Sequence, residues 1–197
     1  PFAGIVPSAI VPVRAAGGTF RIGLIGLTLD QNRQPWVRYA PPIDAAKAAV
    51  AAFKGRVDAI VALTHLSLAG DQALVEAVPE IDLALGGHEH ENWLMRRGPG
   101  FTPIVKADAN VRSVAIVTMT LGARGKKPDI DVRFESLDSV VPEDRRVQAE
   151  VRRWMSRGYD AFRRDGFNPD EVVATITAPL DGRAATIRNR PGTLTDL

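Results

Sequence analysis

The sequence has no cysteine among its 197 residues. This absence excludes disulfide bonds, cysteine-ligated zinc, iron–sulfur clusters and thiol nucleophiles. No run approaches the roughly 18 uninterrupted apolar residues of a membrane-spanning helix, so we expect no membrane partner. The 25 Lys and Arg residues nearly balance the 23 Asp and Glu residues, which leaves a net charge of +2. Without a concentrated basic patch or an aromatic platform, the sequence also argues against a nucleic-acid partner.

The composition is that of a folded, globular protein. Hydrophobic residues make up 45% of the chain and charged residues 24%, so there is enough apolar surface to offset the entropy lost on folding. The length suits one domain, or one domain with part of another. The chain starts at Pro1 rather than Met, with no signal peptide before it, and it ends without a distinctive tail. We therefore expect it to be a middle piece of a longer protein.

Short apolar runs alternate with helix-like segments along the first half of the chain. This order is typical of an α/β layer with parallel strands and right-handed crossovers. Asp44 is the candidate N-cap of the first helix, and Gly55 stands where a helix-ending glycine is expected. Asp58 and Asp82, which open two of the strands, are interpreted as structural caps. The predicted elements are strands at 20–27, 57–63 and 81–85 and helices at 44–54 and 71–78.

The pattern changes in the second half of the chain. Strand-like runs are followed by a charged helix, which we interpret as a linker between the sheet layer and a following unit. The predicted elements here are strands at 103–107, 113–121, 130–137 and 171–178 and a helix at 143–164. The apolar residues on roughly one face of that helix are Val147, Val151, Trp154, Met155 and Phe162.

The chain contains three histidines, and each follows the C-terminal end of a predicted buried strand. His65 follows the strand at 57–63, and His88 and His90 follow the strand at 81–85. Ligand sites in α/β sheets lie beyond the carboxyl ends of the strands, so these loops should bring His65 and His88 close together. Neutral imidazole is a common ligand of divalent transition metals. The residues therefore predict a metal site, with one centre or two adjacent centres.

Two other interpretations of the histidines stay open. His65 could be a loop histidine with a backbone partner, and His88 and His90 could belong to a glycine-supported surface turn. Three histidines do not complete a hydrolytic site, and no nearby carboxylate is in an obviously ligating position. Asp71 and Asn92 are candidates for outer groups that orient the metal ligands, with Asp71 equally suited to cap the helix that it begins. No catalytic residue is identified in this chain.

Two segments around the histidines resemble the last two motifs of the calcineurin-like metallophosphoesterases. They are residues 61–66 (VALTHL) and 83–90 (LALGGHEH). Within these enzymes, the branch that the segments resemble is the 5′-nucleotidase family. Three further segments, 23–28, 103–107 and 179–183, are similar to the family's strand before the linking helix, its strand after the histidine turn and the entry to its separate C-terminal domain.

The resemblance implies the α/β fold of that family, an α+β sandwich. The chain would supply the second half of a metallophosphoesterase β-sandwich flanked by helices, then a linker helix and the start of a second domain. The implied boundaries are 1–140 for the C-terminal part of the metallophosphoesterase domain, 141–168 for the linker helix and 169–197 for the start of the 5′-nucleotidase C-terminal domain.

The resemblance also implies a site for two divalent metal ions, with Mn, Zn, Co, Fe or Ni as candidates. In the family pattern, His65 and His88 bind one ion and His90 binds its neighbour. The implied reaction is hydrolysis of a small-molecule phosphate ester, most directly a nucleotide, by attack of a metal-bound hydroxide on phosphorus. The family's usual location implies a periplasmic or secreted protein, and the oligomeric state is left open.

The earlier motifs of the family are missing from this sequence. It has no Asp-x-His, no Gly-Asp-x-x-Asp and no Asn-His segment. In the family these motifs supply a bridging carboxylate, an Asn ligand and the histidine that stabilises the leaving group. We therefore expect the isolated chain to be inactive and the enzyme to be its full-length parent. The alternative hypothesis is a non-catalytic metal-binding module that uses the three histidines.

Overall fold

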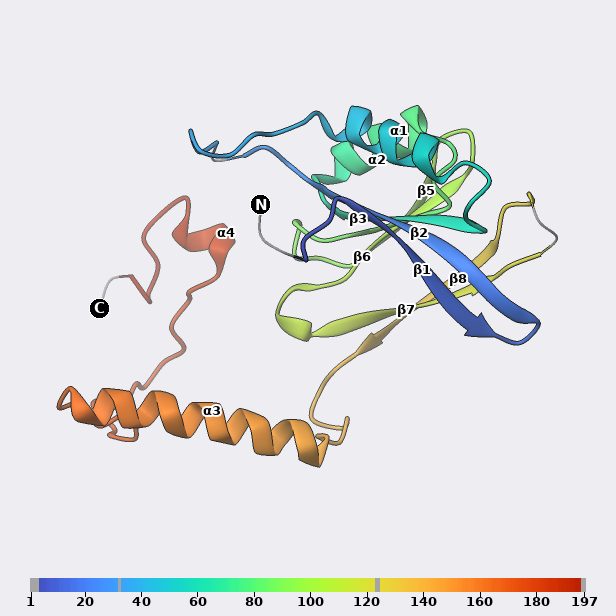
Figure 1. Ribbon diagram of the computed structural model, residues 1–197. Coiled ribbons are helices and arrows are strands. Elements are labelled where there is room, and N and C mark those ends of the chain that lie inside the picture. The colour runs from blue at the N-terminus through green and yellow to red at the C-terminus, as the bar shows by residue number, and fades with distance from the viewer. Residues whose placement is uncertain (1–3, 32, 123–124, 196–197) are drawn as a thin grey trace. The chain divides into compact units, whose positions relative to one another are not determined.

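The computed structural model describes residues 4–31, 33–122 and 125–195. The chain divides into two compact units, one ending at Val141 and the other beginning at Pro142. The first unit is built around a sheet, and the second contains a long helix (Figure 1). All three histidines belong to the first unit.

A sheet with helices on one face forms the first unit. In chain order its elements are β1 (Ser8–Ala15), β2 (Gly18–Thr28), α1 (Pro42–Phe53), β3 (Ala59–His65), α2 (Leu68–Ala77), β4 (Leu83–Gly86), β5 (Trp93–Arg97), β6 (Thr102–Lys106), the 3-10 turn η1 (Ala109–Val111), β7 (Ser113–Thr120) and β8 (Asp129–Ser136). The six-stranded sheet has the order β1-β2-β3-β4-β6-β5. Strands β2, β3, β4 and β6 are parallel, while β1 and β5 are antiparallel edges, and β7 pairs with β8 in a separate antiparallel ribbon.

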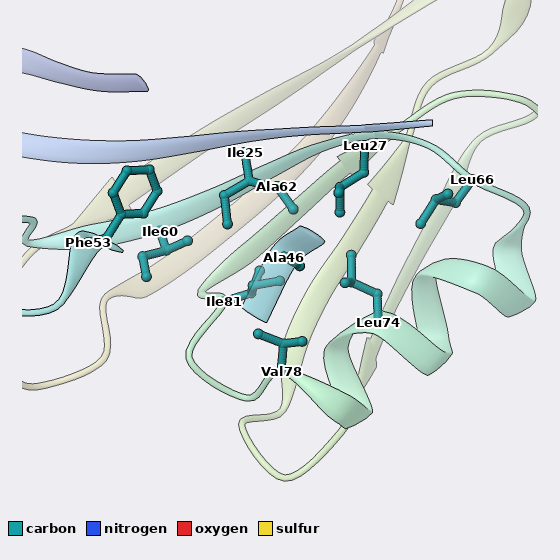
Figure 2. Close-up of a cluster of buried hydrophobic side chains, with 10 residues drawn as sticks. All are labelled: Ile25, Leu27, Ala46, Phe53, Ile60, Ala62, Leu66, Leu74, Val78 and Ile81. Atoms are coloured by element: carbon teal, nitrogen blue, oxygen red, sulfur yellow. The ribbon is translucent and has the colours of Figure 1, made fainter. Parts of the chain in front are cut away.

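Side chains on the strands alternate between two buried faces of the sheet. Along β3, Ile60 and Ala62 pack with Leu74 of α2, whereas Val61 packs with Ile130 of β8. Figure 2 shows the helix-side cluster, which consists of Ile25, Leu27, Ala46, Phe53, Ile60, Ala62, Leu66, Leu74, Val78 and Ile81. The order of layers is helices, six-stranded sheet, two-stranded ribbon, which confirms the predicted α/β class.

The start of α1 differs from the prediction, and its end agrees with it. Pro41 is the N-cap residue and Pro42 the first helical residue, so Asp44 lies in the first turn and the prediction of an Asp44 cap is wrong. The fixed φ of proline suits the first helical position, so the proline pair determines where the helix begins. At the other end, Gly55 follows the C-cap residue Lys54 and adopts a φ of +70°, as a helix-ending glycine should.

The helix α2 begins three residues earlier than predicted. Ser67 is its N-cap residue, and the Ser67 hydroxyl accepts the backbone N–H of Gly70 at 3.1 Å. Asp71 therefore lies in the first turn, and the prediction that it caps this helix is wrong. Ser and Asp side chains cap the free N–H groups of a first turn about equally well. Here Ser67 is the cap, so the helix begins one turn before the predicted start.

Two aspartates at strand starts act as structural caps, as predicted. Asp58 Oδ2 accepts the backbone N–H of Arg21 at 2.7 Å, and Asp82 Oδ2 accepts that of Ile60 at 2.8 Å. Each carboxylate thus links the N-terminal end of its strand to the neighbouring parallel strand. Burial raises the pKa of Asp82 above its usual value, although the Ile60 hydrogen bond and the charge of Lys127 act to lower it.

Three strand assignments differ from the sequence prediction, and one of them is β1, which pairs with β2 where no strand was predicted. The run at 171–178 forms no strand in the structure, and Val172 and Val173 are 81% and 90% exposed. A β-branched run becomes a strand only where another backbone pairs with it, so its propensity alone misled the prediction. Conversely, β5 was not predicted, although it pairs along its whole length with β6.

The second unit consists of the predicted long helix and a short one. Helix α3 (Arg145–Arg164) is capped by Asp144, whose Oδ1 accepts the backbone N–H groups of Arg146 and Val147. The short helix α4 (Ala184–Ile187) follows a turn in which hydrogen bonds from Arg183 hold the pKa of Asp181 far below its usual range. No helix in the described part of the chain is long and apolar enough to span a membrane.

Gly86, the last residue of β4, lies where three elements meet. It pairs with Thr64 of β3 on one side and with Lys106 of β6 on the other. A Cβ atom at this position would lie 2.9 Å from Thr64 Oγ1, 3.0 Å from Lys106 Cε and 3.1 Å from Asp71 Oδ2. The close approach of these side chains leaves room for glycine alone.

We predict that Gly86→Ala lowers the free energy of unfolding by about 1–3 kcal/mol, because the added methyl group overpacks this junction. Gly26→Ala is the matched control, since Gly26 is also in a parallel strand and its Cβ would meet Pro7 O at an ordinary 3.7 Å. Urea denaturation of both variants measures the difference. Equal stability of the two variants would contradict the packing described for Gly86.

We also predict that Leu74→Ala lowers the free energy of unfolding by about 2–5 kcal/mol, because Leu74 is fully buried between α2 and the sheet. Leu94→Ala removes the same atoms from a side chain that is 47% exposed and should cost less than about 1 kcal/mol. Thermal and urea unfolding followed by circular dichroism compare the two. A small loss for Leu74→Ala would show that α2 is not part of the cooperative core.

Candidate functional site

The topology brings two of the three histidines together. His65 is the last residue of β3, and β4 ends at Gly86, which pairs with Thr64. Because β3 and β4 are parallel neighbours, their carboxyl ends meet at the same edge of the sheet. The rings of His65 and His88 consequently lie with their centres 5.4 Å apart and their planes at 77° to each other. The sequence predicted this proximity from the strand order.

The turn after β4 has an unusual backbone. His88 has a φ of +86° and His90 a φ of +61°, both in the left-handed region that side chains with a Cβ rarely adopt. Each such residue costs roughly 1–2 kcal/mol, and strain of this kind gathers at functional sites. Gly87 lies beside His65, since a Cβ atom at Gly87 would be at an ordinary contact distance of 3.6 Å from His65 Nδ1. The strained turn thus directly adjoins the ring of His65.

A buried lysine lies beneath this turn, and sequence reasoning missed it. Lys106, at the end of β6, is 1% exposed. Its Nζ donates to Leu66 O at 2.8 Å and to Glu89 Oε2 at 2.5 Å, and it lies 2.8 Å from Asp71 Oδ2. Two of the three N–H donors of this ammonium group are thus in hydrogen bonds, whereas Asp71 Oδ2 is a charge partner that makes no hydrogen bond within the described residues. The signal in the sequence that could have found it is a lysine at the end of an otherwise apolar strand. Lysine is almost never fully buried unless it is paired, so a lysine at this position indicates a buried ion pair.

Glu89 is held on both of its carboxylate oxygens. Its Oε2 accepts from Lys106, and its Oε1 accepts the backbone N–H of Leu68 at 2.5 Å. Partial burial acts to raise the pKa of Glu89, but the hydrogen bonds from Lys106 and Leu68 outweigh it and hold the pKa below its usual value. The carboxylate between the two histidines of the turn is therefore kept ionised and bonded to the body of the domain.

The two predicted outer groups have other contacts in the structure. Asp71 is fully buried and forms its ion pair with Lys106; in the described part of the chain neither of its carboxylate oxygens makes a hydrogen bond to His65. Asn92 Oδ1 accepts from the backbone N–H of Asp108 at 2.9 Å and from Ser113 Oγ at 2.7 Å. These bonds attach the chain after the histidine turn to the start of β7. Roles for Asp71 and Asn92 toward a metal stay predictions.

The spacing of two of the histidines suits a shared metal ion, whereas the third histidine lies apart from them. Two imidazoles that coordinate one ion through metal–nitrogen bonds of about 2 Å, at an angle of about 90–110°, have ring centres about 4.5–5.5 Å apart, and the spacing of His65 and His88 is 5.4 Å. Across residues 4–31, 33–122 and 125–195, no group of three or more His, Cys, Asp or Glu side chains converges on one point. His90 therefore does not join the other two histidines, which is compatible with its predicted place at a neighbouring ion.

Comparison with known proteins shows which sequences and folds this chain is similar to. No family model matches the chain. Over 90 residues, which are 43% of this chain and 19% of the relative, it is 33% identical to an uncharacterised metallophosphoesterase, YunD, of Bacillus subtilis. The chain thus spans about a fifth of the length of the curated relative that it matches.

Solved structures match over more of the chain. A 5′-nucleotidase precursor of Thermus thermophilus matches with a TM-score of 0.73 and 21% identity over 95% of this chain and 40% of that one. The sulfate thiohydrolase SoxB of T. thermophilus matches with a TM-score of 0.65 and 22% identity over 77% of this chain and 29% of that one. A putative 5′-nucleotidase of Staphylococcus aureus matches with a TM-score of 0.53 and 17% identity, over 77% and 34%. The fold expected from the sequence resemblance is thereby confirmed: this chain has the fold of part of a 5′-nucleotidase, and over 90 residues it is similar to a metallophosphoesterase.

Proposed function

We propose that the chain is part of a metal-dependent phosphoesterase of the 5′-nucleotidase type, which hydrolyses nucleotides with the help of two divalent metal ions. The observation that carries this proposal is the meeting of His65 and His88, with a ring-centre distance of 5.4 Å, at the carboxyl ends of two parallel strands. The strained backbone at His88 and His90 supports a functional role for this turn.

The chain's own residues would hold the metal ions. His65 and His88 would bind one ion through neutral ring nitrogens, and His90 would bind its neighbour. Two such ions, when bound, neutralise phosphoryl oxygens and lower the pKa of water, which provides a nucleophile near neutral pH. Glu89, with both oxygens bonded to Lys106 and Leu68, would stay outside the set of ligands.

The substrate class and the domain roles are part of the same proposal. The similarity to 5′-nucleotidases supports a nucleotide substrate, and the similarity to SoxB keeps sulfur esters as the competing class. The division between Val141 and Pro142 supports the end of the metallophosphoesterase part at residue 140. The further division into a linker helix at 141–168 and the start of a second domain at 169–197 is proposed from the sequence resemblance. A periplasmic or secreted location is proposed by analogy with that family.

We predict that the 197-residue chain binds Co²⁺ or Zn²⁺ and that His65→Ala or His88→Ala weakens the binding of the first ion at least tenfold, because each removes a ligand of the same ion. Isothermal titration calorimetry near neutral pH measures affinity and stoichiometry. The internal comparison is His90→Ala, which should affect a different ion. If all three variants bind as the wild-type chain does, the histidines are not the ligands.

We further predict that the isolated chain shows no hydrolysis of a nucleoside monophosphate when Mn²⁺ or Co²⁺ is added, because the sequence lacks the motifs for a bridging carboxylate and an Asn ligand. Release of inorganic phosphate measures this. The matched sample is the longest natural form of the same gene product, which should be active with two ions per chain. Metal binding without turnover in that longer form would instead favour the non-catalytic metal-binding module.

A further inference from the structure

The carboxylate of Glu89 links the histidine turn to the buried ammonium group beneath it. We propose that Glu89 and Lys106 are positioning residues for His88 and His90: their ion pair holds the turn in the conformation that presents the two imidazoles to metal ions. This inference rests on the proposed function, because it names the groups that shape the proposed metal site. It assigns a role to two residues that do not themselves contact a ligand.

The first step of the argument is the placement of Glu89 within the turn. It stands between two residues of positive φ, so the backbone bends into the left-handed region on either side of it. The glycines at 86 and 87 precede this bend and offer no side chain that could fix it. A strained conformation persists only where surrounding contacts determine it. The contacts that Glu89 makes, to Lys106 Nζ and to the Leu68 N–H, act at the centre of the strained segment.

The second step is the anchoring of Lys106. It pairs in register with Gly86, the residue from which the turn departs, so its side chain starts at the same level of the sheet. Leu66 O at 2.8 Å and Asp71 Oδ2 at 2.8 Å hold the ammonium group from the side of α2. Because Lys106 and Asp71 are 1% and 0% exposed, neither group can turn toward solvent instead. The Glu89–Lys106 ion pair therefore joins the histidine turn to β6 and, through Asp71, to α2.

The third step separates positioning from ligation. A carboxylate beside two histidines is itself a common metal ligand, so Glu89 has an obvious competing role. If Glu89 were a ligand, removing Lys106 would free its carboxylate for the metal and leave binding intact or stronger. If Glu89 positions the turn, removing Lys106 weakens binding. The two roles thus predict opposite effects of the same substitution.

The first experiment compares Glu89→Gln with Glu91→Gln in the 197-residue chain. Both variants remove one negative charge from the same turn region, and Glu91 is an exposed residue two positions away. Titration with Co²⁺, followed by visible absorption, should show at least a tenfold weaker affinity for Glu89→Gln, as expected for loss of a group that orients ligands. Glu91→Gln should bind within about threefold of the wild-type chain. Equal effects of the two substitutions would overturn the proposal, because charge alone would then explain them.

The second experiment removes Lys106 without leaving a buried charge. Lys106→Met combined with Asp71→Asn deletes the ammonium group together with its buried counter-charge, and circular dichroism checks that the variant folds. Positioning predicts at least tenfold weaker Co²⁺ binding. Adding Glu89→Gln to this variant should then change little, since the contact is already lost. Unchanged or stronger binding by the Lys106 and Asp71 variant would identify Glu89 as a ligand and overturn the proposal.

A metal-free measurement distinguishes failure of this inference from failure of the proposed function. Backbone order parameters of residues 87–91, from ¹⁵N relaxation, should fall from about 0.85 toward 0.6 in Glu89→Gln and stay unchanged in Glu91→Gln. A wild-type chain that binds no Co²⁺ would overturn the proposed function. A wild-type chain that binds Co²⁺, with unchanged order in Glu89→Gln, would overturn the positioning role alone.

Discussion

A buried ammonium group determines how the carboxyl edge of this sheet is built. Lys106 is almost fully enclosed, and a buried charge is tolerated only with partners. It therefore draws Leu66 O, the Asp71 carboxylate and the Glu89 carboxylate to one point. These partners come from the loop before α2, from α2 itself and from the turn after β4. This one requirement fixes the edge at which the histidines lie, and the apolar clusters on the two faces of the sheet stabilise the body of the domain.

The parallel arrangement of the strands gives the site its location. Parallel strands end at the same edge, so the residues that follow β3 and β4 become neighbours although more than twenty positions separate them. The opposite edge is used differently: Asp58 and Asp82 accept backbone N–H groups there and join adjacent strands. One edge of the sheet is thus occupied by structural caps and the other is left to histidines and a strained turn. This division is typical of α/β folds, in which the carboxyl ends of strands hold the ligands.

Much of the fold could be predicted because burial leaves a clear pattern. The apolar runs gave the buried strands within two residues, and the glycine-histidine turn stood out because few residue types suit it. The errors in the strand assignments arose because a segment becomes a strand only where another strand pairs with it. The apolar run at 171–178 has strand propensity without a strand to pair with, and β5 depends on β6 more than on its own pattern. The start of α2 was missed because Ser67 and Asp71 are both good caps, and the choice between them depends on packing.

The amino-acid sequence by itself determined the fold class, the order of the buried parallel strands and of the helices between them, and the presence of three histidines at strand ends. Local propensity and the period of the apolar residues are enough for these, since they act between residues close along the chain. Only the tertiary structure decided the geometry of the histidine pair, with ring centres 5.4 Å apart, and that Lys106 reaches Asp71 and Glu89. These contacts join residues 17 to 35 positions apart, and their energy depends on distance and burial in three dimensions, which no local pattern records.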